Sequence, residues 1–459
     1  MITSMLLLLP SLCSGQTRAA SGLPAYQPLR FEEDWNAIDR RATPAYKIKA
    51  IPLVPAITLT LGGQARWREE FVRGFMLTSS ADRYGQSRVL LHADLRAGEA
   101  TGAHARIFAE YRDAQSYERD LPGGTRPIDA DRADVQNLFG DLAYRRSWLR
   151  AGRQEIELGR ARLVGVPDWA NTRQSMDGAR AMLTFAGLAV DALAVRPVVV
   201  RLDAFNRADS AARLNSISIG SARGVPTDVR GMPVTWQLYW HEQSSTVASA
   251  THRLTTGGRA AATAPGNGGR SYGLEAEAAV QRGSSGAKQL RAWFWTLESQ
   301  LRWRNALGTP TLAVGLEEAS GDSDPGDDRL EAFNTLYASA HAHGGDADVL
   351  GRANARQFHA IVNWATVARV SLQSALYRFD RLVLADGAYT KQNSLLRAAS
   401  GSNERHIADE VDLSGSVAAT PQLKVIFGTA WVLPGEFLRA TPGSAQRERW
   451  SYVGTTLTF

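Results

Sequence analysis

Cysteine and long hydrophobic runs are what this chain lacks most clearly. Cys13 is the only cysteine among the 459 residues, so the chain has no framework of internal disulfides and no cysteine-based metal site. The longest apolar run, Met5 to Leu9, falls far short of the roughly 20 residues that a membrane-spanning helix needs. Any role in a membrane must therefore depend on β-strands or on the protein surface.

Lysine is also scarce, because it accounts for 5 of the 52 basic residues and arginine for the other 47. The formal net charge is +6. Proteins that bind nucleic acid usually gather their basic residues in clusters that include lysine. Here the arginines stand singly and often alternate with acidic residues, which argues against nucleic acid as a partner. The planar guanidinium group favours carboxylates and phosphates instead.

The N-terminus has the pattern of a secretion signal, in which an apolar run is followed by the small residues Ser14 and Gly15. We expect residues 1–20 to be a signal peptide, residues 21–55 a periplasmic segment and residues 56–459 a transmembrane barrel. Cys13 suggests a lipoprotein as an alternative, but Leu12 stands where a small residue would be needed. An uncleaved start is the remaining alternative.

Alternation between apolar and polar residues dominates the rest of the chain. It is clearest in residues 57–71, 88–96, 103–112 and 407–417. Successive side chains of a strand point to opposite faces of its sheet. One face is apolar and suits lipid, while the other carries mixed arginine, histidine and acidic residues. Strands in lipid must close into a barrel, because lipid cannot satisfy the polar groups of a free edge.

About 16 to 18 candidate strands can be counted along the chain. Short turns alternate with longer connections, which we place at residues 113–134, 246–270 and 320–351. Short turns on one side and long loops on the other are typical of bacterial outer-membrane barrels. We therefore predict an all-β fold, a transmembrane antiparallel β-barrel of about 18 strands, in the bacterial outer membrane.

The last strand, from Trp450 to Phe459, supports this prediction. Val453, Leu457 and Phe459 share one of its faces. An amphipathic strand that ends on an aromatic residue resembles the recognition signal of outer-membrane barrels. The alternative is the edge strand of a soluble, secreted β-sandwich.

Several short stretches resemble the alginate-export family of outer-membrane barrels. They are Arg30–Trp35, Tyr46–Leu53, Leu61–Glu69, Pro127–Asp134, Arg150–Glu155, Asn171–Arg173, Asp177–Arg180, Ala319–Pro325 and Pro434–Phe437. The similarity extends over about residues 30–459. The resemblance implies an 18-stranded barrel whose arginine-lined pore passes an anionic polysaccharide outward. Six residues match the densest family motif: Arg153, Glu155, Arg162, Arg173, Asp177 and Arg180.

The alternation also predicts which charged residues face the pore. The inward basic residues are Arg66, Arg68, Arg88, Arg96, Arg106, Arg112 and Arg150, and the inward acids are Asp94, Glu110, Glu410 and Asp412. Fixed positive charge in a narrow pore attracts anions, and interleaved acids keep their binding weak enough for conduction. We predict that these residues line the pore together with the motif residues Arg153, Glu155, Arg173, Asp177 and Arg180, and that Arg153, Arg173 and Arg180 shape its constriction. The alternative is that they are ion pairs bracing neighbouring strands.

The sequence contains no glycine-rich phosphate loop and no nucleophile elbow, so we expect neither an enzyme nor a cofactor. Asp322 and Asp324 resemble part of a calcium loop, but the third ligand and the distal glutamate are missing, so a solvated acidic turn is preferred. His341 and His343 alone do not make a metal site.

The leading hypothesis is a passive channel that passes an anionic, alginate-like polysaccharide, with the lipid bilayer and periplasmic export proteins as its partners. The first alternative is a general or anion-selective porin for the uptake of small solutes. A membrane-embedded hydrolase is a third hypothesis, but no suitable catalytic set can be assembled from the sequence.

Overall fold

The computed structural model describes residues 26–36, 46–98, 102–246, 250–365 and 369–459. The expected signal peptide, residues 1–20, lies outside the described residues. The helices are all short: η1 (Arg30–Glu32), η3 (Phe75–Leu77), η4 (Asn267–Gly269), η5 (Ala340–Ala342) and α1 (Glu436–Ala440). None of the helices in this part of the chain has both the length and the apolar character needed to cross a bilayer.

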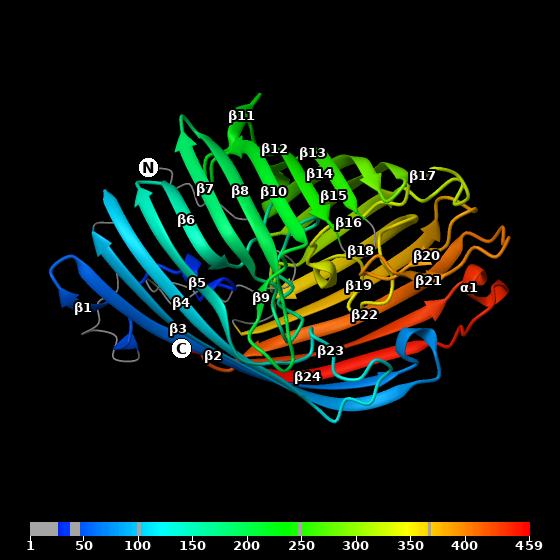
Figure 1. Ribbon diagram of the computed structural model, residues 1–459, viewed down its shortest axis with the longest axis horizontal. Helices are drawn as coiled ribbons and strands as arrows, with labels where there is room; N and C mark the ends of the chain where they lie inside the picture. Colours follow the sequence, from blue (N-terminus) through cyan, green and yellow to red (C-terminus); the bar gives the residue numbers. More distant parts are fainter. Residues whose placement is uncertain (1–25, 37–45, 99–101, 247–249, 366–368) are drawn as a thin grey trace.

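Eighteen antiparallel strands form a closed barrel, as the alternation predicted (Figure 1). In chain order they are β2 (Ile57–Arg73), β3 (Ala81–Gly98), β4 (Ala103–Tyr117), β5 (Asp131–Tyr144), β6 (Ser147–Gln154), β7 (Met176–Phe185), β8 (Leu188–Val199), β10 (Ala212–Ser221), β12 (Met232–Ser245), β13 (Thr251–Pro265), β14 (Arg270–Ser285), β15 (Lys288–Trp303), β16 (Thr311–Ala319), β18 (Ala355–Ala365), β19 (Val370–Arg381), β22 (His406–Ala418), β23 (Leu423–Pro434) and β24 (Glu448–Thr458).

Six short strands lie outside this ring or extend it: β1 (Ile51–Val54), β9 (Arg207–Ala208), β11 (Thr227–Val229), β17 (Arg329–Leu330), β20 (Ala388–Tyr389) and β21 (Leu395–Arg397). All but β17 pair antiparallel with a neighbour, and β17 pairs parallel with the start of β15.

Pairing between the first and last wall strands closes the barrel. β2 and β24 pair continuously from Gln64 opposite Thr458 to Arg73 opposite Arg449. β24 lies beside β2 in Figure 1, although the two strands stand at opposite ends of the wall sequence. Every wall strand therefore has two neighbours, and the wall has no free edge.

The two faces of the wall are those that the sequence predicted. On β2 and β3 the apolar residues Leu61, Trp67 and Leu91 are exposed on the outside, whereas Arg68 and Arg88 are buried on the inside. The last strand follows the same rule: Val453 and Leu457 are exposed, and Trp450 is buried in the barrel. An apolar outer face and a polar inner face are what a barrel in a bilayer requires.

The connections differ in length at the two ends of the barrel. Two-residue turns, such as residues 145–146 and 186–187, lie at the end where β2 begins, and the opposite end carries the long loops 155–175, 320–354 and 382–405. In outer-membrane barrels the short turns are periplasmic. The long connection expected at residues 246–270 is wrong, because β13 occupies most of it. Small residues such as Gly257 and Ala260 hide the alternation there.

The segment before the barrel enters its periplasmic mouth. Phe31 of η1 packs edge-on against the inward rings of Phe108 and Phe139, with centroids 5.8 and 5.4 Å away. Arg30 donates hydrogen bonds to the carbonyl oxygens of Gly63 and Phe459, at 2.7 and 3.1 Å. The described part of residues 21–55 is therefore attached to the wall at the point of barrel closure.

The depth of a residue on the outer face should determine the cost of a charge there. We expect Leu91→Arg, near the middle of β3, to lower the free energy of unfolding by about 2–4 kcal/mol, because it places a charge in hydrocarbon. Tyr144→Arg, at the periplasmic end of β5, is the matched control and should cost about 0–1 kcal/mol. Urea titration of the barrel refolded in phospholipid vesicles measures both, and equal costs would contradict this membrane placement.

Candidate functional site: the constricted lumen

Two long loops turn inward and fill much of the lumen. We call residues 155–175, between β6 and β7, the first lumen loop, and residues 320–354, between β16 and β18, the second lumen loop. Ile156 and Leu163 of the first loop are almost fully buried in a hydrophobic cluster with wall residues that include Leu214 and Phe294. Apolar side chains in a loop thus serve as anchors on the inner face of the wall.

The two lumen loops bind each other across the barrel. Gly165 donates its backbone N–H to the carbonyl oxygen of Tyr337 at 2.9 Å, and Tyr337 donates in return to Leu163 at 2.9 Å. Trp169 of the first loop stacks on His341 of the second, with ring centroids 4.5 Å apart. These contacts make the two loops a single constriction.

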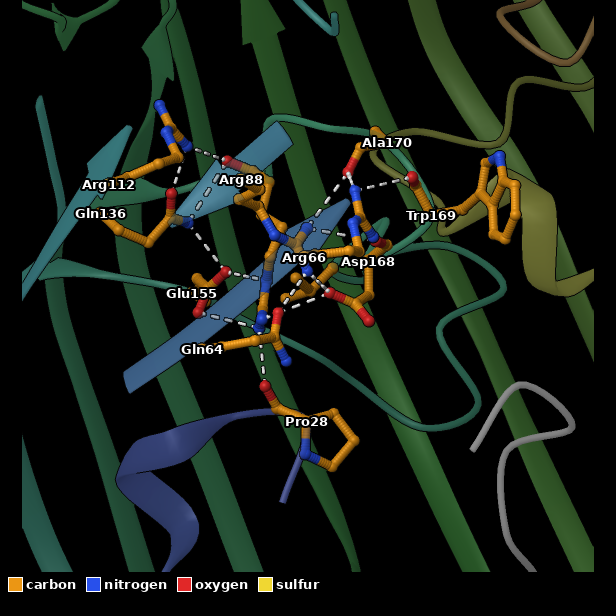
Figure 2. A network of polar contacts seen from close by, with 12 residues as sticks. Pro28, Gln64, Arg66, Arg88, Arg112, Gln136, Glu155, Asp168, Trp169 and Ala170 are labelled. Carbon is orange, nitrogen blue, oxygen red and sulfur yellow. Dashed lines mark hydrogen bonds and ion pairs between the residues drawn. The ribbon is translucent and has the colours of Figure 1, made fainter. Parts of the chain in front are cut away.

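Three predicted pore arginines hold the first lumen loop against the wall, and Figure 2 shows two of them, Arg66 and Arg88, beside Asp168, Trp169 and Ala170. Arg66 donates to the carbonyl oxygens of Asp168 and Ala170 at 2.8 and 3.2 Å. Arg68 donates to the carbonyl oxygen of Trp169 at 2.8 Å, and Arg88 donates to the carbonyl oxygen of Asp168 at 3.2 Å. All three side chains are buried. We call them the arginine clamp, since they supply charged donors to carbonyl groups that have no partner in a strand.

The carboxylate of Asp168 is the exposed centre of this cluster. It lies 2.7 Å from Arg88 and 3.4 Å from Arg173, yet 52% of its side-chain surface remains exposed to the lumen. Burial alone would raise the pKa of Asp168, but the guanidinium groups of Arg88, Arg173 and Arg66 hold that pKa below its ordinary value. Asp168 therefore stays charged where a solute would pass. Asp168 could not be predicted from the alternation of the sequence, because it stands in a loop without alternation.

Arg173 connects the clamp to the rest of the lumen. It forms an ion pair with Glu155 at 2.6 Å and donates to the carbonyl oxygen of Pro28, in the N-terminal segment, at 3.0 Å. Arg112 donates to the carbonyl oxygen of Arg173 at 2.9 Å and also forms an ion pair with Asp131. Figure 2 shows this chain of contacts from Arg112 through Glu155 to Pro28. The predicted residues Arg112, Glu155 and Arg173 thus meet in one network.

Three further predicted arginines lie on the inner face in wall ion pairs. Arg106 binds Asp94 at 2.7 Å, Arg150 binds Asp141 at 2.8 Å, and Arg180 binds Asp191 at 2.7 Å. Arg96 is paired with Asp94 at 3.0 Å and also reaches the N-terminal segment through Asp34 at 3.1 Å. These contacts correspond to the strand-bracing alternative.

The predicted acids Glu410 and Asp412 hold the second lumen loop. They are buried on the inner face of β22 and accept backbone N–H groups of Ala347 and Asp346, at 2.8 and 3.0 Å. Asp348 in the same loop is paired with Lys391 at 2.8 Å. The acids therefore anchor this loop as the arginine clamp anchors the first loop.

Arg153 and Asp177 do not face the lumen, contrary to the prediction. They are paired with each other at 2.8 Å, and Arg153 is directly opposite Leu138, whose exposed side chain belongs to the outer face. Alternation continues through Gly152, so Gln154 faces inward and Arg153 outward. Arg153 is nevertheless tied to the rim, since it also contacts Asp134 at 3.4 Å.

A second charged cluster lies on the opposite wall, and Arg162 is its only member that the family motif indicated. Arg162 of the first lumen loop binds Glu275 at 2.7 Å and lies close to Glu277 and Glu317. Burial alone would lower the pKa of Arg162, but these three carboxylates raise it above its ordinary value. Arg352 of the second loop binds Glu317 at 2.6 Å. The alternation of Glu275 and Glu277 with apolar residues was the signal that could have revealed them.

The calcium candidates Asp322 and Asp324 take other roles. The backbone N–H of Asp322 binds Asp386 at 2.8 Å, and the carboxylate of Asp324 caps a turn by accepting the N–H of Gly326 at 3.0 Å. Within the described ranges, no group of three or more histidine, cysteine or acidic residues is arranged to hold a metal ion. The role of Asp324 in this structure is therefore to cap a turn.

Comparison with known proteins identifies the family. The family model described as alginate export matches residues 57–452. The chain belongs to this family. No curated protein that was compared with the chain matched it. The family covers the whole barrel wall except the last residues of β24.

Solved structures with the same fold are outer-membrane proteins of Pseudomonas aeruginosa. OpdK aligns with a TM-score of 0.60 and 14% identity, over 87% of this chain and 98% of its own. OpdL aligns with a TM-score of 0.59 and 12% identity, over 88% and 99%. A structure of OpdK with vanillate has a TM-score of 0.59 at 13% identity, over 87% and 98%. These identities establish the fold alone. Together, family and fold are those of bacterial outer-membrane channels rather than enzymes.

Loss of the arginine clamp should loosen the constriction. We expect the double variant Arg66→Gln with Arg88→Gln to have a larger and noisier single-channel conductance, because each hydrogen bond from a charged donor contributes about 1.5–3 kcal/mol to holding the loop. Arg180→Gln is the control, because it removes a wall ion pair that does not contact the loop. Planar-bilayer recording distinguishes them. Equal conductance in the double variant and the wild type would show that the clamp does not restrain the loop.

The lowered pKa of Asp168 predicts a pH-independent constriction. A depressed carboxyl pKa stabilises the folded loop at all pH values above the ordinary pKa of about 3.9, and this contribution is lost only as the pH falls through the lowered value. Ion selectivity should therefore be unchanged from pH 7 to about pH 5, whereas Asp168→Asn should increase anion preference at pH 7. Reversal potentials measure both, and a titration centred near pH 5 would contradict the assignment.

Proposed function

We propose that this channel passes an anionic polysaccharide of the alginate type through the constriction formed by the lumen loops. The observation that supports this most directly is Arg66. Among the described residues, its guanidinium group contacts only neutral oxygens, those of residues 168–171, and no carboxylate. It therefore adds positive charge beside the exposed carboxylate of Asp168. Carboxylate groups of a polymer suit such a site through electrostatic attraction, since the donors of Arg66 are already bound to loop oxygens and its charge is not neutralised by them.

The acids beside the arginines support passage rather than tight capture. The nearby arginines attract the carboxylates of a cargo. Asp168 and Glu155 repel the same carboxylates. Conduction requires sites that are favourable enough to enter and weak enough to leave. The family also favours a saccharide cargo. Because the N-terminal segment occupies the periplasmic mouth and binds Arg106 and Arg173, it is the element that a periplasmic export partner would contact first.

A small organic anion is the second candidate. The specific observation in its favour is the backbone pairing of the two lumen loops. Besides the bonds of Tyr337, the backbone N–H of Ser339 donates to the carbonyl oxygen of Ala161 at 3.0 Å, so the two loops cross the lumen together. A polymer needs a continuous path past this pair, whereas a small solute needs only a gap beside it. OpdK, which shares the fold, has been solved with vanillate, a small carboxylate.

Bilayer recording with two classes of cargo tests the proposal. We expect anion-selective reversal potentials in a KCl gradient and concentration-dependent current block by uronate oligomers, but no block by neutral glucose oligomers of equal length. Arg66→Gln should weaken the block by about tenfold, because the loss of one charge beside the path removes about 1.4 kcal/mol of attraction, and Arg180→Gln should not. Block by a monomeric carboxylate with none by oligomers would favour the second candidate. A cation-selective pore would refute both.

A further inference from the structure

The outer face of the barrel carries an arginine pair that has no role in the lumen. Arg282 of β14 and Arg291 of β15 are directly opposite each other in the strand register. Both side chains are exposed, and their neighbours Gln281 and Ala292 are buried on the inner face. In the described part of the chain neither guanidinium group has an ion-pair partner. Like charges placed directly opposite across two strands destabilise the pair unless an anion lies between them.

The register places this pair at a defined depth. One row of paired outward residues runs across four strands and consists of Trp240, Thr256, Val280 and Trp293. Trp293 is exposed on the outer face. Tryptophan at the outer face of a barrel marks the boundary between hydrocarbon and headgroups. Arg282 and Arg291 stand two residues beyond Val280 and Trp293, about 7 Å further along the tilted strands and away from the hydrocarbon.

This end of the barrel is the extracellular one. β14 and β15 are joined by residues 286–287, which lie at the same end as the long lumen loops and opposite the periplasmic turns at residues 145–146 and 186–187. The arginine pair therefore lies at the height of the headgroups of the outer leaflet. Two further exposed arginines extend the patch. Arg329 of β17 is paired with Gln289, next to Arg291, and Arg213 of β10 lies in the following outward row.

The carboxylate in the row of Arg282 is already occupied, and so is that of Glu331, which follows the pairing of Leu290 with Leu330 and accepts the backbone N–H of Ser323 at 3.1 Å. Glu242 of β12 lies in the same row as Arg282, separated from it by Leu254, and it binds Asn215 at 2.9 Å and His252 at 2.9 Å. Two other outward arginines at this end are neutralised: Arg356 pairs with Glu318 at 2.6 Å and Arg378 with Asp380 at 3.5 Å. Arg282 and Arg291 differ from them in this respect.

We propose that Arg282 and Arg291 form a binding site for the phosphate of a phosphorylated lipid headgroup in the outer leaflet. A phosphate between the two guanidinium groups relieves their mutual repulsion and accepts charge-assisted hydrogen bonds from both. The acyl chains of the same lipid lie along the apolar surface of Val280 and Trp293. The occupant is a lipid rather than free phosphate, because the site is continuous with the hydrocarbon-facing surface.

Titration of the full-length, detergent-solubilised barrel with diphosphorylated lipid A tests the site, with native mass spectrometry as the readout. We expect the double variant Arg282→Gln with Arg291→Gln to raise the Kd by about tenfold or more. The matched control, Arg356→Gln with Arg378→Gln, should bind as the wild type does. Arg282→Lys with Arg291→Lys should retain partial binding, and heat-modifiable migration on a gel shows that each variant is folded.

Two further arms separate lipid from free phosphate. Dephosphorylated lipid A should bind no better to the wild type than to the glutamine variant, and millimolar inorganic phosphate should not displace the diphosphorylated lipid. The proposal is overturned if the glutamine variant binds as the wild type does, or if inorganic phosphate competes at a concentration equal to that of the lipid. Channel conductance should be the same in all variants, so the result is independent of the proposed cargo.

Discussion

Backbone polar groups find no water inside a bilayer, and this constraint determines most of the structure. It explains why β2 and β24 pair along ten residues of each strand, from Gln64 to Arg73 and from Arg449 to Thr458. It also explains why apolar residues alternate so regularly along the wall, since each strand must present one face to lipid. Once the wall is closed, variation is left to the inward side chains and to the loops. These two parts carry the function.

The same constraint acts a second time inside the lumen. Loops that cross the lumen have carbonyl groups without strand partners, and arginine side chains supply the missing donors. The arginine clamp does so for residues 168–170, and Arg352 does so for the carbonyl oxygen of Arg162. Arg397 binds the carbonyl oxygens of Leu438 and Thr441 in the same way. Arginine offers five donors in a planar fork and lysine three on one atom, which gives a structural reason for the scarcity of lysine.

The sequence predicted the wall well and the lumen poorly, for a physical reason. Strand faces follow from neighbours in the sequence, so the inward positions of Arg66, Arg88 and Glu410 could be read directly. The exposed position of Asp168 could not, because it depends on how Ile156 and Leu163 dock on strands that stand far away in the chain. Arg153 failed for a different reason. It belongs to a family motif beside Gly152, where a break in the alternation would turn it inward, but the alternation continues and places Arg153 outside.

The groups that an arginine binds indicate its role more clearly than its position in the barrel does. Arginines bound to carbonyl oxygens organise loops, and those bound to wall carboxylates, such as Arg150 and Arg180, brace strands. The wall ion pairs leave little charge for a solute. Charge is available only where a guanidinium group lacks an acidic partner, as in Arg66 inside the barrel and Arg282 outside it. An arginine-rich composition is therefore weak evidence for an anionic cargo, because only the few arginines without an acidic partner can attract one. The other arginines would be needed to build the same constriction for any cargo.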